Sequence, residues 1–487
     1  MTREFSRQAF VRGFGVVTAG ALLGSCRQTA SSDSRTTPTP TGPRDWDALG
    51  DALEGQVVLP SDADYARAKG LFNVRFADST PAAVISVKST ADVQKAVAFA
   101  AERDLKITVR SGGHSYVGAS AANGAMVIDL RHLPGGVVVE EGSGLTTISA
   151  AAVLNSVQNA LNVHGLSIPT GSCPSVGVPG LTLGGGLGAD ARRSGLTCDA
   201  LLSASLVLPS GEVVTASPDD HADLYWALRG GGANFGVVTL FTFQTFPTTD
   251  RDVVSLVFPE SATAQAIFGW HEWLSTADRA IWSMVNITVG PSSWRCGVVL
   301  AGPPGDGLRV AGELSAALGV QPVESTRRTL NHMAFVNYFA GGADAARPRA
   351  FVAGSDIVGV MTPAAAESIV TAMSAWSRVV GSATAVIESL DGAVSDISSG
   401  DTAFPWRRQA ACVQWYVETP SQAATSAAND WLAHAHLAVA ANSVGGYVNY
   451  VEPGMPDARY FGDNLQRLKA IRQRCDPAAV MYSSLDL

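Results

Sequence analysis

Two short glycine-rich segments of this sequence each carry one side chain that can form a covalent bond. The first holds His114 and reads Arg110-Ser111-Gly112-Gly113-His114-Ser115-Tyr116, and the second holds Cys173 and reads Gly171-Ser172-Cys173-Pro174-Ser175-Val176-Gly177. Glycine is used where the backbone must come close to a neighbour or take a positive φ. An imidazole and a thiol on two such loops suggest a large flat ligand, held from both sides and attached through His114 and Cys173.

Taken together, the two segments resemble those of the berberine-bridge-enzyme-like oxidases, FAD enzymes of the vanillyl-alcohol-oxidase superfamily. The resemblance rests on R-S-G-G-H ending at His114 and G-x-C-P-x-V-G around Cys173, which lie in that order and 59 positions apart. It extends from about Phe72 to Tyr482. It implies an FAD whose 8α-methyl group is bonded to the His and whose C6 is bonded to the Cys. It also implies an α+β fold, with a two-lobed FAD-binding domain of the PCMH type and a separate substrate domain.

The expected cofactor contacts lie in the two loops, in a glycine stretch that follows them, and at two later positions. They are His114, Cys173, Arg110, Ser111, Gly112, Gly113, Ser115, Val176, Gly177, Gly180, Gly184, Gly185, Gly186, Val237 and Asn449. The stretch 180–188 is interpreted as the start of a helix with exposed backbone amides, which would favour the FAD pyrophosphate. The alternative is that these glycines serve close packing. For Arg110 the alternatives are a salt-bridged strand end and a charge that stabilises reduced flavin. A small Val176, by resemblance, leaves room for O2 and favours an oxidase over a dehydrogenase.

The same resemblance indicates where the catalytic side chains should lie. Tyr450 follows an Asn near the C-terminus and is expected beside the flavin, as the base for the substrate hydroxyl proton; the alternative is a half-buried structural tyrosine. A free tyrosine has a pKa of about 10, so it needs help near neutral pH. Glu388 is the candidate partner, unless it is a solvent-facing acid. Gln414 stands where some family members carry a Glu, and a neutral amide can hydrogen-bond to substrate but cannot accept its proton.

The FAD that the resemblance implies would accept a hydride from a C–H bond next to a heteroatom. Our first hypothesis is an exported oxidase of sugars or oligosaccharides that acts on the anomeric hydroxyl and releases hydrogen peroxide. Four tryptophans are then candidate sugar platforms: Trp282, Trp294, Trp406 and Trp415. The alternatives are an oxidase of secondary-metabolite alcohols, a flavin lipoprotein that passes electrons to a quinone or partner protein and, more remotely, a binding module without flavin.

The N-terminal residues look like a targeting segment. Three arginines precede an apolar stretch at 14–23, which is shorter than the roughly 20 residues needed to span a bilayer. That stretch ends in Leu23-Gly24-Ser25-Cys26, which resembles a lipoprotein box. We therefore expect an extracytoplasmic protein anchored to the membrane through a lipid on Cys26. The alternative is secretion with cleavage near Cys26 and no lipid. Residues 6–11 resemble a twin-arginine signal, except that Gln8 replaces the second arginine.

Composition and pattern set the remaining expectations. The chain has 487 residues, 46% of them hydrophobic, and a net charge of −9 without a basic tract, which favours a globular enzyme and argues against a nucleic-acid partner. The histidines show no metal-binding spacing. We expect a signal at 1–26, a tether and lead-in segment at 27–63, and an FAD-binding domain at 64–247. A substrate domain at 248–440, with an antiparallel sheet backed by helices, precedes a C-terminal segment at 441–487 that returns to the FAD-binding domain.

Overall fold

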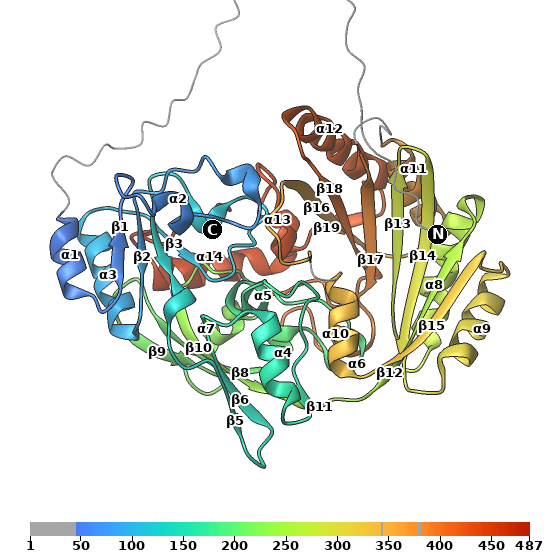
Figure 1. The fold of residues 1–487 in the computed structure, drawn as a ribbon, viewed down its shortest axis with the longest axis horizontal. Coiled ribbons are helices and arrows are strands. Elements are labelled where there is room, and N and C mark those ends of the chain that lie inside the picture. Colours follow the sequence, from blue (N-terminus) through green and yellow to red (C-terminus); the bar gives the residue numbers. More distant parts are fainter. Residues whose placement is uncertain (1–44, 342–343, 377–380) are drawn as a thin grey trace, which may run out of the picture. The chain divides into compact units, whose positions relative to one another are not determined.

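The structure is a computed structural model that describes residues 45–341, 344–376 and 381–487 (Figure 1). The expected signal, and the tether as far as residue 44, lie outside the described residues. From Pro43 to Leu487 the chain forms one compact unit. Its helices and sheets confirm the predicted α+β class. In the described part of the chain, no helix is long and apolar enough to cross a membrane.

The first part of the unit contains a four-stranded sheet of order β1-β2-β4-β3, in which β1 is antiparallel and the others are parallel. The strands are Gln56–Val58 (β1), Ala83–Ser86 (β2), Ile107–Arg110 (β3) and Met126–Asp129 (β4). Helices α1 (Trp46–Ala52) and α2 (Tyr65–Ala68) come early in this part. A parallel pair needs a crossover, and α3 (Thr90–Glu102) supplies it between β2 and β3. The hydroxyl of Ser89 caps α3 by accepting a hydrogen bond from the amide of Asp92.

A second, antiparallel sheet of order β5-β6-β10-β8-β9 follows. Its strands are Val137–Glu140 (β5), Leu145–Ser149 (β6), Leu201–Val207 (β8), Val213–Ala216 (β9) and Val237–Gln244 (β10). A hairpin that turns at Ser210-Gly211 joins β8 to β9. The segments between these strands contain α4 (Leu154–Asn162), β7 (Leu166–Ser167), α5 (Val178–Leu183), α6 (Ala191–Ser194) and α7 (Ala222–Leu228). After the last strand, β11 (Phe246–Pro247) pairs with β7.

An eight-stranded antiparallel sheet of order β15-β12-β14-β13-β17-β18-β16-β19 dominates the later residues. Its strands are Arg251–Phe258 (β12), Trp282–Gly290 (β13), Ser293–Gly302 (β14), Glu324–Leu330 (β15), Phe351–Val358 (β16), Ala383–Ser389 (β17), Ala411–Glu418 (β18) and Ser443–Gly445 (β19). One face packs on α8 (Thr263–Thr276), α9 (Gly307–Leu318), α11 (Pro363–Ser374) and α12 (Gln422–Val439). Side chains alternate along a strand, so Val285 and Ile287 enter this core while Met284 and Asn286 face the other way. Helix α10 (His332–Ala340) lies on that other side.

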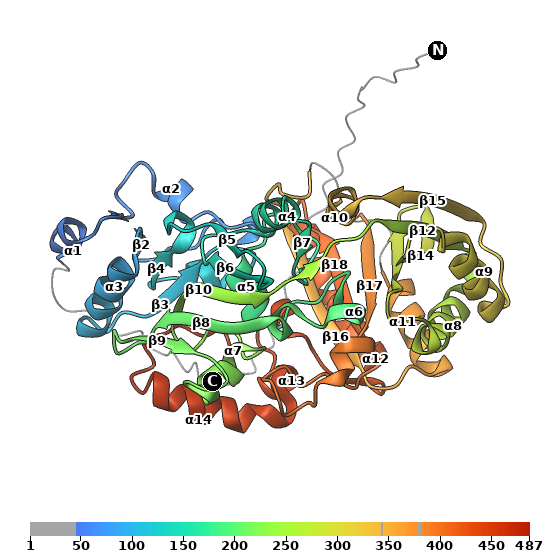
Figure 2. The ribbon, with the colours of Figure 1, turned by 90° about the horizontal axis from the view of Figure 1, so that it is seen from below.

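The C-terminal residues connect the two parts of the unit. Strand β19 pairs with β16, a 3-10 turn spans Val448–Tyr450, and α13 (Ala458–Phe461) and α14 (Leu465–Cys475) follow. Figure 2 shows α14 beside α7, and Arg467 and Arg474 of α14 both form ion pairs with Asp223 of α7. Beyond α14, Met481 forms a parallel bridge with Ile107 of β3. The last part of the chain therefore lies against the first sheet.

Candidate functional site

The two glycine-rich loops lie directly against each other. A Cβ on Gly112 would lie 2.4 Å from the backbone nitrogen of Gly177, and a Cβ on Gly177 would lie 2.3 Å from Oγ of Ser111. Strand β3 ends at Arg110 and leads into the first loop, while the second loop ends at Gly177, the residue that caps α5. Glycine is required at both positions because the loops cross backbone to backbone.

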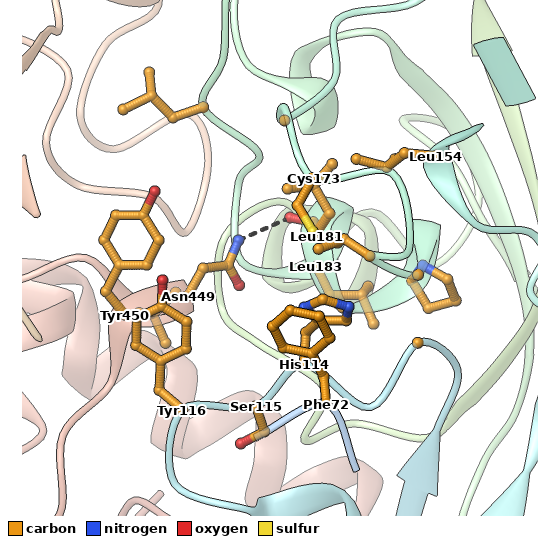
Figure 3. A pocket seen from close by; sticks show the side chains of 18 of the residues that line it. Phe72, His114, Ser115, Tyr116, Leu154, Cys173, Leu181, Leu183, Asn449 and Tyr450 are labelled. Atoms are coloured by element: carbon orange, nitrogen blue, oxygen red, sulfur yellow. Dashed lines mark hydrogen bonds between the residues drawn. The ribbon is translucent and has the colours of Figure 1, made fainter. Parts of the chain in front are cut away.

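One hydroxyl group links the two reactive side chains. Oγ of Ser175 lies 3.0 Å from Nε2 of His114 and 3.8 Å from Sγ of Cys173. The imidazole stacks on the ring of Phe72, and the two ring centroids lie 3.9 Å apart. Figure 3 shows this pair of rings near Cys173. Burial lowers the pKa of His114 to about 4, so the ring is neutral at neutral pH. A neutral imidazole keeps one ring nitrogen with a free lone pair, as a nucleophile requires.

His114 and Cys173 both line a cavity of about 690 Å³ between the loops and the eight-stranded sheet. The sheet contributes polar, aromatic and aliphatic side chains from β13, β16, β17 and β18. These are Trp282, Met284, Asn286, Phe351, Thr384, Val386, Glu388, Gln414 and Tyr416. Helix α10 adds Phe335 and Phe339, and the end of the chain adds Tyr482 and Leu485. A pocket of this size with a few polar groups is typical of a cofactor or small-molecule site.

Glu388 is a carboxyl group on a central strand of this cavity wall. It pairs in register with Cys412 of β18 and with Met284 of β13. Its carboxyl group forms no hydrogen bond or ion pair with any residue that the structure describes. Burial raises its pKa from 4.5 to about 7. The group can therefore gain or lose a proton near neutral pH.

Tyr450 lies in a stack of phenol rings on the same cavity. Its ring is parallel to that of Tyr116, with centroids 5.2 Å apart, and Figure 3 shows the pair beside Asn449. The amide of Gln414 donates a hydrogen bond to the Tyr116 hydroxyl. Burial, and next the charge of Glu388, raise the pKa of Tyr450 well above its usual value. The phenol therefore keeps its proton at neutral pH.

Asn449 fixes the turn that carries Tyr450. Its Nδ2 donates to the carbonyl of Leu181, a bond drawn in Figure 3, and to the hydroxyl of Tyr447, at 3.1 and 2.8 Å. The Tyr447 hydroxyl also accepts a hydrogen bond from the amide of Gly186. A Cβ on Gly184 would lie 2.1 Å from Oδ1 of Asn449. The end of the chain is thus docked onto the residues that follow α5.

The cavity lining includes Gly180 but not five other expected contacts, which are Gly184, Gly185, Gly186, Arg110 and Val237. The prediction that 180–188 begins a helix is wrong: Gly180 lies inside α5, Gly184 ends that helix, and Gly185 and Gly186 pack behind it, since the backbone leaves the helix with positive φ at both. Arg110 is 1% exposed and pairs with Asp129 at 2.7 Å, and Val237 is buried in β10. Neither residue lines the cavity.

Three of the four tryptophans proposed as platforms also lie elsewhere. Trp294 donates to Thr263, Trp406 donates to the carbonyl of Gly446, and Trp415 is in the core beside Asp356. Only Trp282 of the four lines the cavity. An alternating strand pattern identifies the two faces of a strand but not the face that meets the ligand. For this reason the proposed platforms included three tryptophans that do not line the cavity.

The sequence analysis missed Ser175, Phe72 and Phe351 as site residues. Ser175 stands two positions after Cys173 inside the second motif, so its position was an available signal. Phe72 and Phe351 come together only in the folded chain, where the Asn73 side chain donates to the carbonyl of Phe351 at 3.1 Å. Among the described residues, no group of His, Cys, Asp and Glu could hold a metal ion.

The first loop also offers free hydrogen-bond donors. The backbone amides of Gly112, Gly113, His114 and Ser115 donate to no acceptor within the described residues. All four residues line the cavity. A Cβ on Gly180, which also lines the cavity, would meet open space. Free amides on a glycine-rich loop beside an elongated cavity fit a ligand that joins a phosphate group to a flat ring.

Comparisons with known proteins agree with this chemistry. The family described as "FAD binding domain" matches residues 81–217, and the family described as "Berberine and berberine like" matches residues 446–484. The chain therefore carries an FAD-binding domain and a segment similar to the berberine family, and it is an FAD-dependent oxidoreductase. Both matches cover cavity residues: the first includes His114 and Cys173, and the second includes Asn449 and Tyr450.

Relatives of this oxidoreductase match most of its length. A chitooligosaccharide oxidase of Gibberella zeae is 28% identical over 460 residues, which cover 87% of this chain and 91% of the relative. An FAD-linked oxidoreductase of Bacillus subtilis is 26% identical and covers 88% and 95%. The crystal structure of a carbohydrate oxidase from Microdochium nivale superposes with a TM-score of 0.80, at 25% identity, over 90% of this chain and 98% of that one.

Proposed function

We propose that this FAD-dependent oxidoreductase oxidises an alcohol carbon of a sugar or oligosaccharide, with O2 as electron acceptor and hydrogen peroxide as product, and that its flavin is held by two covalent bonds. The observation that carries the proposal is the crossing of the two glycine-rich loops. This crossing brings the neutral imidazole of His114 and the thiol of Cys173 to the same serine hydroxyl. Both groups line a cavity that is also lined by Glu388 and Tyr450.

The residues present fit FAD. The free amides of residues 112–115 are suited to the pyrophosphate, and His114 and Cys173 are suited to the ring. When bound, FAD supplies the acceptor for a hydride from the substrate. Phe72 supports the imidazole from behind by stacking.

Glu388 is the group suited to hold the substrate hydroxyl proton. Its pKa of about 7 matches the working range of a general base near neutral pH. Tyr450 has a pKa raised far above that range, so it acts as a hydrogen-bond donor that orients the substrate oxygen. Gln414 is held by Tyr116 and offers an amide to a further substrate hydroxyl.

The substrate class is supported by the mixture of groups on the cavity wall. Asn286, Thr384 and Gln414 offer hydrogen bonds, and Trp282 and Phe339 offer flat apolar faces. Such a mixture suits a sugar ring, which has polar edges and apolar faces. Peroxide release should be measured with a panel of oligosaccharides and with aromatic and polyketide alcohols. Turnover of aromatic or polyketide alcohols but of no oligosaccharide would show that the substrate is a secondary-metabolite alcohol. Fast reoxidation of the reduced flavin by a quinone, and not by O2, would show that the electron acceptor is a quinone.

The covalent bonds are tested by the mass and absorbance of denatured protein. The unmodified chain should stay yellow and carry the mass of about one FAD. Replacing His114 or Cys173 alone by alanine should leave one bond, so that only the double variant releases all flavin on denaturation. Ser172→Ala, at an exposed neighbouring position, is the control and should keep the adduct. Free flavin from the unmodified protein would refute bicovalent attachment.

We also propose export and a lipid anchor at Cys26, on the strength of the sequence at 14–26. The segment lies outside the described residues. Metabolic labelling with a radioactive fatty acid should mark the unmodified protein and not Cys26→Ser. Label in neither protein, with the protein found outside the cell, would favour secretion without a lipid.

A further inference from the structure

A buried cluster of four charged groups lies where the C-terminal segment meets the eight-stranded sheet. His436 of α12 is placed between two carboxylates, with Nδ1 2.7 Å from Oδ2 of Asp356 and Nε2 2.7 Å from Oε2 of Glu452. Arg459 donates to Oδ1 of Asp356 at 2.8 Å. The side chains of Asp356, Glu452 and His436 are 1%, 3% and 12% exposed. Burial of this kind makes each lost partner costly.

The geometry defines the protonation state of His436. A neutral imidazole donates from one nitrogen only, whereas two ionised carboxylates each need a donor. Both ring nitrogens of His436 meet a carboxylate oxygen, so the doubly protonated ring satisfies both bonds. The cluster then has two positive and two negative groups, and its charges balance.

The same cluster brackets the turn that carries Tyr450. Glu452 comes two residues after Tyr450, and its Oε1 accepts a hydrogen bond from the amide of Ser355 at 3.2 Å. On the other side of the turn, the amide of Tyr447 donates to Oγ of the same Ser355 at 2.9 Å. Strand β16 makes room for the carboxylate, because a Cβ on Gly354 would lie 2.2 Å from Cδ of Glu452.

We propose that His436 is a positioning residue, whose imidazolium, clamped between Asp356 and Glu452, fixes the turn bearing Asn449 and Tyr450 against strand β16. Its effect on catalysis rests on the proposed function, because it acts through Tyr450. Its effect on the turn does not. His436 does not line the cavity, and neither do its partners Asp356, Glu452 and Arg459.

The clamp depends on pH. Burial by itself would lower the pKa of His436, but the hydrogen bonds and charges of Asp356 and Glu452 outweigh it and raise the pKa to about 9. Arg459, whose Nη2 lies 3.1 Å from Nδ1, is the like charge that faces the ring. Ser443 and Trp415 donate to Asp356, and Tyr460 accepts from the amide of Glu452. Because the pKa of His436 in the folded protein is raised above 6.5, the protonated ring stabilises the fold fully below pH 6.5. This stabilisation disappears as the pH rises through about 9.

Hydrogen exchange of the peptide 446–452 in the holoenzyme tests the clamp without any substrate. After correction for intrinsic exchange, protection in the unmodified protein should fall as the pH passes about 9. In His436→Gln the protection of this peptide should be roughly tenfold lower already at neutral pH. In Glu452→Gln the pH at which protection falls should be lower by at least about one unit. His434→Gln, an exposed position on the same helix, is the control and should leave exchange unchanged.

Where a substrate turns over, His436→Gln should lower kcat several-fold with little change in KM, and Glu452→Gln should move the alkaline limb of kcat downward. Protection of 446–452 that is flat across pH 9 in the unmodified protein would overturn the proposal, even if a variant fails to fold. So would a His436→Gln protein that exchanges like His434→Gln. Absence of turnover with every substrate would count against the proposed function only, since the exchange result stands apart from it.

Discussion

Glu388 shows how one carboxyl group can take its role from its place in a sheet. An acid on a central strand would usually be paired, but Glu388 faces the cavity with no hydrogen-bonding partner among the described residues, and burial alone raises its pKa to about 7. The folded state therefore holds this proton more tightly than the unfolded chain. It follows that the free energy of unfolding falls as the pH rises from 4.5 to about 7.

We predict two separate effects of Glu388→Gln. The kcat should fall by about 10² to 10⁴, and the rise of activity around pH 7 should disappear, because the amide cannot accept a proton. The variant should also melt at a higher temperature than the unmodified protein at pH 8, with the difference lost near pH 4.5. Glu418→Gln, an exposed acid on β18, is the control for both. Unchanged kcat would remove Glu388 from the mechanism.

At the scale of elements, the site depends on two loops that touch through glycines. Gly112→Ala puts a Cβ 2.4 Å from the backbone of Gly177, and this must separate the loops. We expect a loss of about 1–3 kcal/mol in the free energy of unfolding and much less covalent flavin. Both can be read from thermal melts and from the mass of denatured protein.

Gly180→Ala is the matched contrast. The position is helical and its Cβ meets open space, so stability should be unchanged or rise by about 0.5–1 kcal/mol, while flavin incorporation falls because the methyl group enters the cavity. Equal destabilisation by the two alanines would show that the contact between the loops is not what requires glycine.

The loops of the site could be predicted from the sequence, but the neighbours of several site residues could not. The two motifs indicated glycine-rich loops that carry His114 and Cys173, and in the structure both residues line the cavity. Local pattern failed where the answer depends on distant residues. Gly184 is glycine because Asn449 packs on it, and the partner of Arg110 is Asp129 on the next strand. Helix ends and long-range neighbours are set by tertiary contacts, which one sequence does not display.

At the scale of the whole unit, Arg192 is one of several buried arginines that join the earlier part of the chain to the later part; Arg251 with Asp190 and Arg407 with Asp199 are others. Arg192 of α6 forms an ion pair with Asp391 at 2.7 Å, and its guanidinium donates to backbone carbonyls at the end of α8 and in the segment before β13. Among the described residues no other side chain donates to these four carbonyls, from Leu274 to Ile281, and the carbonyls of Ala277 and Ile281 accept no backbone hydrogen bond in the connecting segment either. The two parts of the unit should therefore unfold together.

We predict that Arg192→Met lowers the free energy of unfolding by about 3–5 kcal/mol, because it leaves buried carbonyls and a carboxylate without their donor. Denaturant titrations followed by circular dichroism and by flavin fluorescence will measure it. Arg193→Met, at the next and exposed position, should cost less than about 1 kcal/mol. Two separate transitions in the unmodified protein would contradict the joint unfolding of the unit.

The position of Tyr450, Tyr482 and Leu485 in the cavity wall has a consequence for biosynthesis. Ribosomes make a chain from its N-terminus, so the loops bearing His114 and Cys173 emerge well before Tyr450, Tyr482 and Leu485, which close the site. A nascent chain thus displays both loops before it has a finished chamber around them. The cavity can be completed only once residue 485 has been synthesised, so cofactor loading into the finished cavity must follow synthesis of the C-terminal segment.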